Sequence, residues 1–278
     1  MITDVAYKWA RRAMSQSFYD YVSFNLLGRK IRYEKWETYR DILAHYKSKG
    51  LDFRGKAVAE FGCGRQYFTA LGFLAEGARH VHMVEPKLAF SREVLAQHLA
   101  VFNARYGAAL TLAHAEKSIS CHADSSAMGR DCDGTLDLIC SFTVLEHVGD
   151  LAGCFADMAR LLRPGGAAYH MVDVSDHTYQ VFARWPVLEK INHYRALYHL
   201  RYSERGFRQL NDPKCFMNRE LLPTYLALAK KNGLKVAGLE PAPYREKVKV
   251  HPEVLARAGT SPDPEQVKVT SFALSLRK

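Results

Sequence analysis

The chain has 278 residues, of which 48% are hydrophobic and 24% charged, and its formal net charge is +10. This composition is that of a globular protein with one large domain, or one domain and a cap, and it excludes fibrous and low-complexity chains. No apolar run approaches the length that spans a bilayer, and the first twelve residues lack the apolar stretch of a signal peptide. We therefore expect a cytoplasmic protein without a membrane span.

The six cysteines are scattered without a Cys-x-x-Cys pair, which fits reduced thiols better than a disulfide framework or a zinc site. The positive charge permits an anionic partner. Because lysine and arginine are spread along the chain with no long basic run, we favour a generally basic surface.

Residues 1–54 are expected to form helices ahead of the core. Thr3 or Asp4 can cap a first helix, and a second is predicted over residues 30–49, with Gly50 ending it. The segment before residue 30 is rich in aromatic side chains, which are typical of core packing and also of a lid. We expect these residues to form a helical lid over the ligand edge of the core.

From residue 55 the chain alternates between strand and helix patterns, and the third strand is ambiguous. That strand is either 110–114 or 119–122. The other predicted strands are 57–61, 80–84, 136–142 and 167–174, and the helices are 66–76, 88–106 and 150–162, with a helix stop at Arg163-Pro164-Gly165-Gly166. Such alternation predicts a parallel sheet with right-handed crossovers.

The second half of the chain departs from this rhythm. Residues 175–217 interleave aromatic and arginine side chains directly after the fifth strand, where substrates enter such sheets. This insertion fits both a packed helical cap and a substrate contact. A helix over 219–232 and strands over 234–239 and 266–276 follow, and we expect the two strands to form an antiparallel pair.

The first strand runs into Glu60-Phe61-Gly62-Cys63-Gly64, an acidic-x-Gly-x-Gly turn. Glycines there permit a tight bend and a close approach of a ligand to the main chain, and the next helix offers free N–H groups. The second strand ends at Glu85, at about the spacing where nucleotide-type folds bind ribose hydroxyls. Since the carboxyl ends of parallel strands share an edge, 60–64, Glu85 and 141–147 are expected around one crevice.

These motifs, with Leu161-Leu162-Arg163-Pro164-Gly165-Gly166 and the segment 136–148, resemble class I S-adenosylmethionine-dependent methyltransferases over about residues 55–175. The resemblance implies a doubly wound, Rossmann-like α/β fold. Its seven-stranded sheet is mostly parallel with an antiparallel last strand, and it carries N-terminal helices and a helical cap insertion. We therefore divide the chain into a lid, 1–54, and a methyltransferase core, 55–278, with the cap insertion at 175–217.

The resemblance also implies site residues and a cofactor, S-adenosylmethionine, with S-adenosylhomocysteine as product. Asp124 resembles the acid that contacts adenine, and Glu116 is the alternative if the third strand is the earlier one. Glu85 would hold the ribose hydroxyls. The remaining expected cofactor contacts, beginning with those to the methionine part, are Glu60, Gly62, Cys63, Gly64 and Ser141.

Residues 170–177, His170-Met171-Val172-Asp173-Val174-Ser175-Asp176-His177, and the later Asn218-Arg219 resemble a subgroup with a His-x-x-Asp-x-x-Asp-His signature and a long cap. That subgroup is associated with tailoring of small molecules and glycans. We expect a small-molecule acceptor, with an oxygen of a glycan or natural-product scaffold as the nucleophile, and a monomer or homodimer.

A hydroxyl nucleophile loses a proton, so a base is useful. His147, just past the fourth strand, is the first candidate base, although it also fits a helix-start residue bonded to the backbone. Asp173 ends the fifth strand and can orient the base or bind a substrate hydroxyl, and His177 is the second candidate base. Because His170 and Asp173 are expected to face opposite ways, we predict no metal site from His170, Asp173 and His177.

Three other functions compete with this interpretation. Ser141-Phe142-Thr143-Val144 stands where adenine-amino methyltransferases carry Asn/Asp-Pro-Pro-aromatic, which disfavours a nucleic-acid substrate. An RNA or protein methyltransferase and a non-catalytic S-adenosylmethionine-binding module remain alternatives. A nicotinamide oxidoreductase is disfavoured because Gln66-Tyr67 stand where a third glycine is needed.

Overall fold

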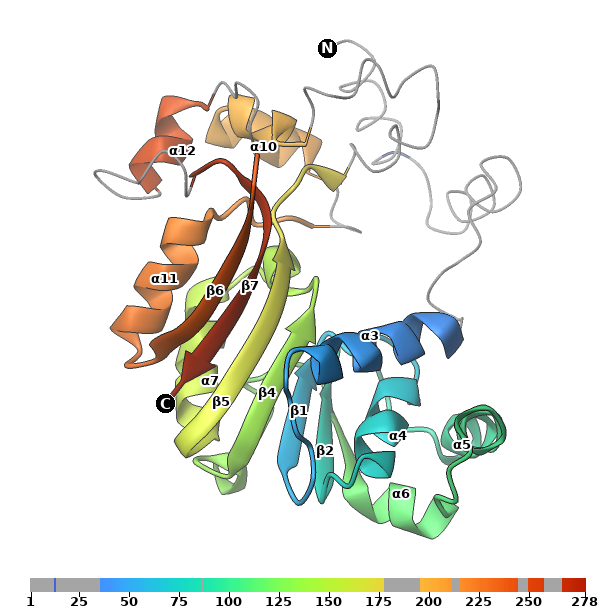
Figure 1. Ribbon diagram of the computed structural model, residues 1–278. Helices are drawn as coiled ribbons and strands as arrows, with labels where there is room; N and C mark the ends of the chain where they lie inside the picture. The colour runs from blue at the N-terminus through green and yellow to red at the C-terminus, as the bar shows by residue number, and fades with distance from the viewer. Residues whose placement is uncertain are drawn as a thin grey trace.

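The computed structural model describes residue 13 and residues 36–86, 88–177, 196–211, 216–244, 250–257 and 267–278. These residues form one seven-stranded sheet of order β3-β2-β1-β4-β5-β7-β6 (Figure 1). The strands are β1 (Ala57–Phe61), β2 (His80–Val84), β3 (Ile119–His122), β4 (Leu136–Phe142), β5 (Leu162–Asp173), β6 (Lys235–Pro243) and β7 (Val269–Arg277). The first five strands pair in parallel, and β7 runs antiparallel to both β5 and β6. The predicted fold class is confirmed.

Helices cover both faces of this sheet (Figure 1). One core cluster joins the sheet to α3 (Trp36–Ser48), α4 (Phe68–Ala75), α5 (Arg92–Tyr106) and α6 (Leu112–Ser118). The other joins it to α7 (Leu151–Leu161) and α11 (Leu222–Lys231). The shorter elements are η3 (Arg130–Cys132), η4 (Leu145–His147), η5 (Tyr198–Arg201), α10 (Glu204–Leu210) and α12 (Pro252–Arg257).

Local sequence explains where the helices begin and end. Ser91 accepts a hydrogen bond from the backbone of Val94 at the start of α5, and Gly107 ends that helix with φ +71°. Asp150 caps α7 in the same way. Helix α4 is apolar nearly all round and buried, because it lies between the sheet and α3.

The structure resolves one ambiguity of the sequence and corrects several boundaries. The third strand is the later option, and residues 112–118 form α6, which Thr111 caps. Helix α5 begins at Arg92, four residues after the predicted start, because Ser91 is its cap. Strand β5 begins at Leu162, so Arg163-Pro164-Gly165-Gly166 lies within the strand after α7 has ended.

The C-terminal boundaries also shift. Helix α11 begins at Leu222 and not at Arg219, because Arg219 has a left-handed φ of +60° and cannot continue a helix. Strand β6 extends to Pro243, and the sequence did not predict α12.

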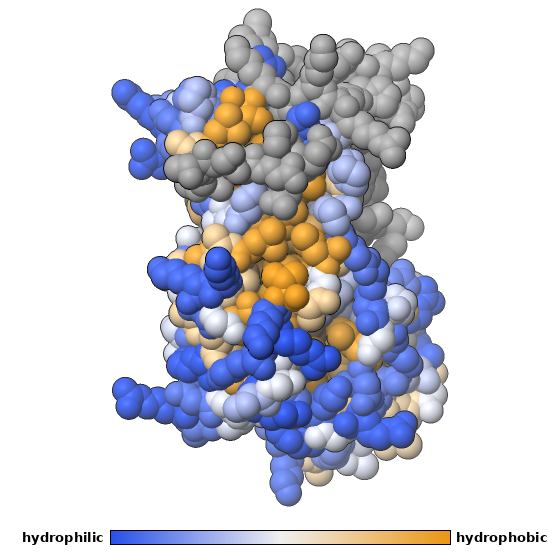
Figure 2. Space-filling model, turned by 60° about the vertical axis from the view of Figure 1, so that its left-hand side comes forward, coloured by the Kyte–Doolittle hydropathy of each residue, from blue (hydrophilic) through white to orange (hydrophobic). Residues whose placement is uncertain are grey.

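On the side that carries β6 and α11, Figure 2 shows apolar side chains gathered across the middle of the molecule. Hydrophilic side chains predominate in the lower part of this view, and a further apolar patch lies near its top.

The lid and the cap are only partly described. The predicted first helix lies outside the described residues, whereas α3 falls within the predicted 30–49 and packs on α4 where Gly72 lets Leu43 approach. Of the cap, η5 and α10 are described, and a small apolar cluster joins η5 to α12. The division at residue 54 and the cap limits stay predictions. No helix among the described residues has both the length and the apolarity to cross a membrane.

Candidate functional site

The glycine turn after β1 is held between the ends of β2 and β4. Gly62 and Gly64 have φ of +69° and +70°, a conformation that favours glycine. A Cβ at Gly62 would lie 2.3 Å from Cγ2 of Val144, whereas a Cβ at Gly64 would meet nothing closer than the Tyr39 hydroxyl at 3.6 Å. Gly62 N–H donates to the carbonyl of Val84 over 2.7 Å. The turn therefore packs tightly at Gly62 and leaves space at Gly64.

Two of the predicted cofactor residues support this turn from inside the core. Glu60 is 3% exposed, and the Thr69 hydroxyl of α4 donates to its carboxylate over 2.5 Å. Desolvation raises the pKa of Glu60 to about 7. Cys63 is also buried, and burial raises the pKa of its thiol well above the usual value. The carboxylate of Glu60 therefore ties the end of β1 to α4, and the side chain of Cys63 packs in the core.

Glu85 lies beside the same turn. It directly follows β2 and is partly exposed, and its charge acts on the thiol of Cys63. Its backbone N–H donates to the carbonyl of His122 over 2.9 Å, which ties it to the end of β3. This position, at the carboxyl end of the strand next to β1, is the one expected of a ribose ligand.

Asp124 lies on the loop that follows β3. Its exposed carboxylate accepts hydrogen bonds from the Ser126 hydroxyl over 2.6 Å and the Ala127 backbone over 2.8 Å, and these bonds lower its pKa. Glu116 was the alternative only if the third strand were the earlier one, 110–114. The third strand is the later one, β3, and Glu116 lies on α6, where it pairs with Arg92 over 2.5 Å.

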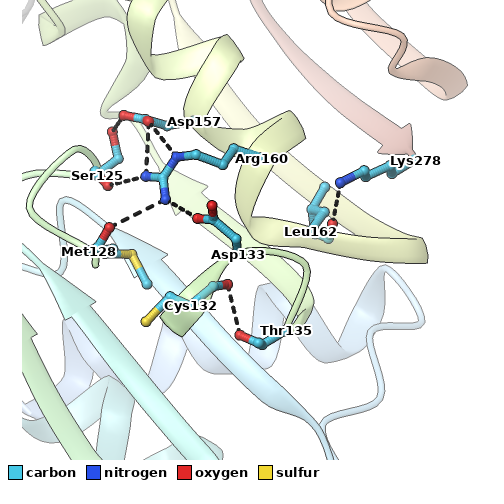
Figure 3. A network of polar contacts seen from close by, with 9 residues as sticks. All are labelled: Ser125, Met128, Cys132, Asp133, Thr135, Asp157, Arg160, Leu162 and Lys278. Carbon is cyan, nitrogen blue, oxygen red and sulfur yellow. Dashed lines mark hydrogen bonds and ion pairs between the residues drawn. The ribbon is translucent and has the colours of Figure 1, made fainter. Parts of the chain in front are cut away.

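Arg160 of α7 anchors the loop that carries Asp124 (Figure 3). Its guanidinium donates to the backbone carbonyls of Ser125 over 3.2 Å and Met128 over 3.3 Å. It also pairs with the carboxylates of Asp133 and Asp157. One side chain thus holds both ends of the loop segment next to Asp124.

Ser141 lies in β4 beside Phe61 at the end of β1, and its side chain is turned into the sheet. It is fully buried, and its hydroxyl lies 2.7 Å from Nδ1 of His170, its partner in the β4–β5 pair. Desolvation lowers the pKa of His170 to about 3, so the imidazole is neutral. The side chain of Ser141 is engaged within the sheet, and a cofactor contact of this residue stays a prediction.

The three predicted catalytic residues come together beyond β4 and β5. The rings of His147 and His177 lie 4.8 Å apart between centroids. The negative charge of Asp173 acts on both imidazoles and on the carboxyl group of Glu146. We call Glu146, His147, Asp173 and His177 the β4–β5 polar cluster. Thr143, with φ +53°, and Val144 lead from β4 into η4, so the cluster adjoins the glycine turn through Val144.

Residues 216–218 hold η4 in place. The side-chain amide of Asn218 donates to the carbonyls of Leu145 over 2.7 Å and Val148 over 3.1 Å, and its backbone N–H donates to the carbonyl of Glu146 over 2.8 Å. The carbonyl of Phe216 accepts from Nδ1 of His147 over 2.5 Å. His147 is therefore bonded to the backbone, as one interpretation of the sequence expected, while its Nε2 stays available.

Sequence reasoning missed Glu146. Its side chain is 1% exposed, and within the described part of the chain neither carboxylate oxygen makes a hydrogen bond of normal geometry. Desolvation raises its pKa to about 8, and the nearby backbone amides of Glu146 and Asp173 oppose this shift only in part. The signal in the sequence was an acid directly before His147, in the segment that follows the fourth strand.

Comparison with known proteins matches this chain to a family. The model of a methyltransferase domain family matches residues 29–211. None of the curated proteins compared with the chain gives a significant match.

Solved structures share the fold at low sequence identity. Phosphoethanolamine N-methyltransferase 2 from Haemonchus contortus, in complex with phosphomonomethylethanolamine and S-adenosylhomocysteine, is 16% identical with a TM-score of 0.51. That match covers 96% of this chain and 59% of the Haemonchus chain. An S-adenosylmethionine-dependent methyltransferase from Mesorhizobium loti is 15% identical over 84% of this chain and 96% of its own, with a TM-score of 0.48.

The family match spans more than half of the chain, and the sheet order with an antiparallel β7 agrees with it. The glycine turn and Glu85 stand at the carboxyl ends of β1 and β2, where the cofactor of this fold binds. The chain therefore belongs to the methyltransferase domain family and is a class I S-adenosylmethionine-dependent methyltransferase, with S-adenosylhomocysteine as its product.

Proposed function

We propose that this enzyme transfers the methyl group to a hydroxyl oxygen of a small molecule, with a glycan or natural-product scaffold as the acceptor. The observation that carries the proposal is the position of the β4–β5 polar cluster. Glu146 and His147 of this cluster lie on η4, which begins after Val144, and Val144 is the residue that packs against Gly62 of the glycine turn. An acceptor at the cluster would lie next to a methionine moiety at the turn.

The chemistry requires alignment and the removal of one proton. The acceptor oxygen bonds to the methyl carbon while the carbon–sulfur bond breaks and its electron pair stays on sulfur. Alignment alone can supply about 7–11 kcal/mol of the barrier in favourable cases. The hydroxyl proton must leave, and a polar cluster beside the methyl group assists that step.

His147 is in the tautomer that suits this role. The Phe216 carbonyl accepts from Nδ1, so the proton is assigned to Nδ1 and the lone pair to Nε2. Burial lowers the pKa of His147 and of His177, so both rings are neutral near pH 7. Their lone pairs can act on the acceptor directly, as bases, or through a bound cation.

The kind of acceptor, the location and the oligomeric state were also predicted from the sequence. The Haemonchus enzyme acts on a small phosphorylated amine, which makes a small acceptor on this fold reasonable, and the proton-accepting cluster supports oxygen as the nucleophile. The cytoplasmic location is supported by the cysteines of the described residues, which are all free. The monomeric or homodimeric state stays a prediction from the sequence.

A panel of acceptors tests this function through the release of S-adenosylhomocysteine. Each hydroxylated sugar or scaffold is paired with its O-methylated counterpart, and amines, RNA and a protein mixture complete the panel. We expect turnover on a hydroxylated small molecule and none on its blocked partner. Turnover confined to amines, RNA or protein would contradict the proposal, as would a folded, cofactor-binding protein that methylates nothing in a broad panel.

A further inference from the structure

We propose that Glu146, His147 and His177 form a binding site for a divalent first-row transition-metal cation. Each residue offers one ligand atom, and these atoms all lie within 4.8 Å of one another. Ligand atoms at about 2.0–2.2 Å from a cation lie roughly 3–4 Å apart, so side-chain movements of about 1 Å complete the site. Metal binding here does not depend on the identity of the acceptor.

The first argument is the state of Glu146. A carboxyl group that is 1% exposed, with no hydrogen bond of normal geometry to either oxygen among the described residues, is costly to bury in its charged form. Protonation removes the charge but leaves the polar oxygens unsatisfied. A cation removes both penalties at once, and the nearby charge of Asp173 strengthens its attraction.

The second argument is the way in which the two histidines are held. Metal-binding histidines usually donate their second ring nitrogen to a carbonyl or carboxylate, which fixes the tautomer and the ring. His147 donates Nδ1 to the carbonyl of Phe216, so its lone pair is on Nε2. The ring of His177 lies 4.8 Å from that of His147 between centroids, and the backbone of Asp173 is near enough to raise its pKa. A neutral imidazole keeps one nitrogen with a lone pair that can bind a cation.

The third argument is rigidity. Asn218 binds the carbonyls of Leu145, Glu146 and Val148, and the carbonyl of Val144 accepts from the backbone N–H of His147. The segment that carries two of the three ligands is thus held by hydrogen bonds at both of its ends. A metal site keeps its geometry when the backbone that carries its ligands is held in this way.

The ligand set points to the kind of cation. Two imidazoles with one carboxylate suit Zn²⁺, Mn²⁺, Fe²⁺ or Co²⁺, whereas Mg²⁺ prefers oxygen ligands throughout. Three protein ligands leave coordination positions open, as in catalytic sites. If the proposed function holds, the acceptor oxygen occupies one of them, since a cation lowers the pKa of a bound hydroxyl. His147 and His177 are then metal ligands and not bases.

The test is a calorimetric titration of the chelator-treated full chain with Zn²⁺ and, separately, with Mn²⁺. Glu146→Gln and His177→Asn change one ligand each with little change in volume. Glu93→Gln on α5 and His114→Asn on α6 are matched controls, because they make the same chemical changes at exposed positions outside the site. Binding of S-adenosylhomocysteine by each variant shows that it is folded.

We expect one cation per chain in the wild type and in both controls, with affinity at least about tenfold weaker in Glu146→Gln and His177→Asn. Folded wild-type protein that binds neither cation would overturn the proposal, as would binding that Glu146→Gln leaves unchanged. Either result leaves the methyltransferase assignment intact, because cofactor binding and turnover are measured separately. Hydroxyl methylation at an unchanged rate after complete metal removal would refute the link between cation and acceptor.

Discussion

Replacing Gly62, Gly64 and Gly107 by alanine, one at a time, alters three positions that share a backbone conformation and differ in surroundings. Their φ values are +69°, +70° and +71°. A Cβ at Gly107 meets nothing within 4 Å, one at Gly64 makes an ordinary contact with Tyr39, and one at Gly62 lies 2.3 Å from Val144. Differences among the three variants therefore separate backbone strain, steric clash and ligand approach.

The magnitudes follow from these distances. A non-glycine residue in the left-handed region costs roughly 1–2 kcal/mol, which is the whole expected loss for Gly107→Ala and Gly64→Ala. Gly62→Ala adds about 1–3 kcal/mol for overpacking, because Val144 must move by more than a few tenths of an ångström. In the double variant with Val144→Ala the two Cγ atoms are gone but Cβ stays 3.0 Å away, so part of that loss is recovered.

Urea denaturation and calorimetric titration with S-adenosylhomocysteine measure the two effects. We expect Gly64→Ala to match Gly107→Ala in stability and to bind the product much more weakly, because its methyl group fills the space where the ligand approaches the main chain. Gly107→Ala should bind like the wild type. If Gly62→Ala were no less stable than Gly107→Ala, or if Gly64→Ala bound the product normally, the description of the turn would be refuted.

Three further predictions concern the surroundings of the turn. The folded chain holds the proton of Glu60 up to about pH 7 and the unfolded chain only to about pH 4.5, so stability falls as pH rises between these values. Glu60→Gln removes this dependence, and its stability relative to the wild type should grow by up to roughly 3 kcal/mol from pH 4.5 to pH 8 in urea denaturation. Glu85→Ala should weaken binding of S-adenosylmethionine several-fold or more with unchanged stability, and equal affinity in calorimetry would remove its ribose role. Arg160→Ala should cost about 1–3 kcal/mol and lower cofactor affinity by freeing the loop after β3, whereas the exposed control Arg92→Ala should cost less than about 1 kcal/mol and leave affinity unchanged.

The sequence predicted the strands of the core well because their signals are local. Strands β1 and β4 are mostly apolar and β2 alternates histidine with apolar residues, and the observed limits of all three equal the predicted ones. The start of α5 was missed because the apolar pattern extends past its cap, Ser91. The choice between two strands after residue 108 needed tertiary pairing, since only 119–122 pairs with β2.

The candidate site was predictable in its positions and not in its contacts. Strand ends and spacing brought His147, Asp173 and His177 to one edge of the sheet. The burial of Ser141 against His170 depends on β4–β5 register, which the sequence does not display. The orphaned carboxylate of Glu146 depends on how residues 216–218, seventy positions later, close over η4.

The most direct test of the account is a calorimetric titration of the purified, folded chain with S-adenosylmethionine and with S-adenosylhomocysteine, compared with Gly64→Ala and Gly107→Ala. The account predicts saturable binding of both ligands, at one site per chain, by the wild type and Gly107→Ala, and much weaker binding by Gly64→Ala. A folded wild-type chain that binds neither ligand would contradict the assignment of the glycine turn and the methyl-transfer chemistry built on it.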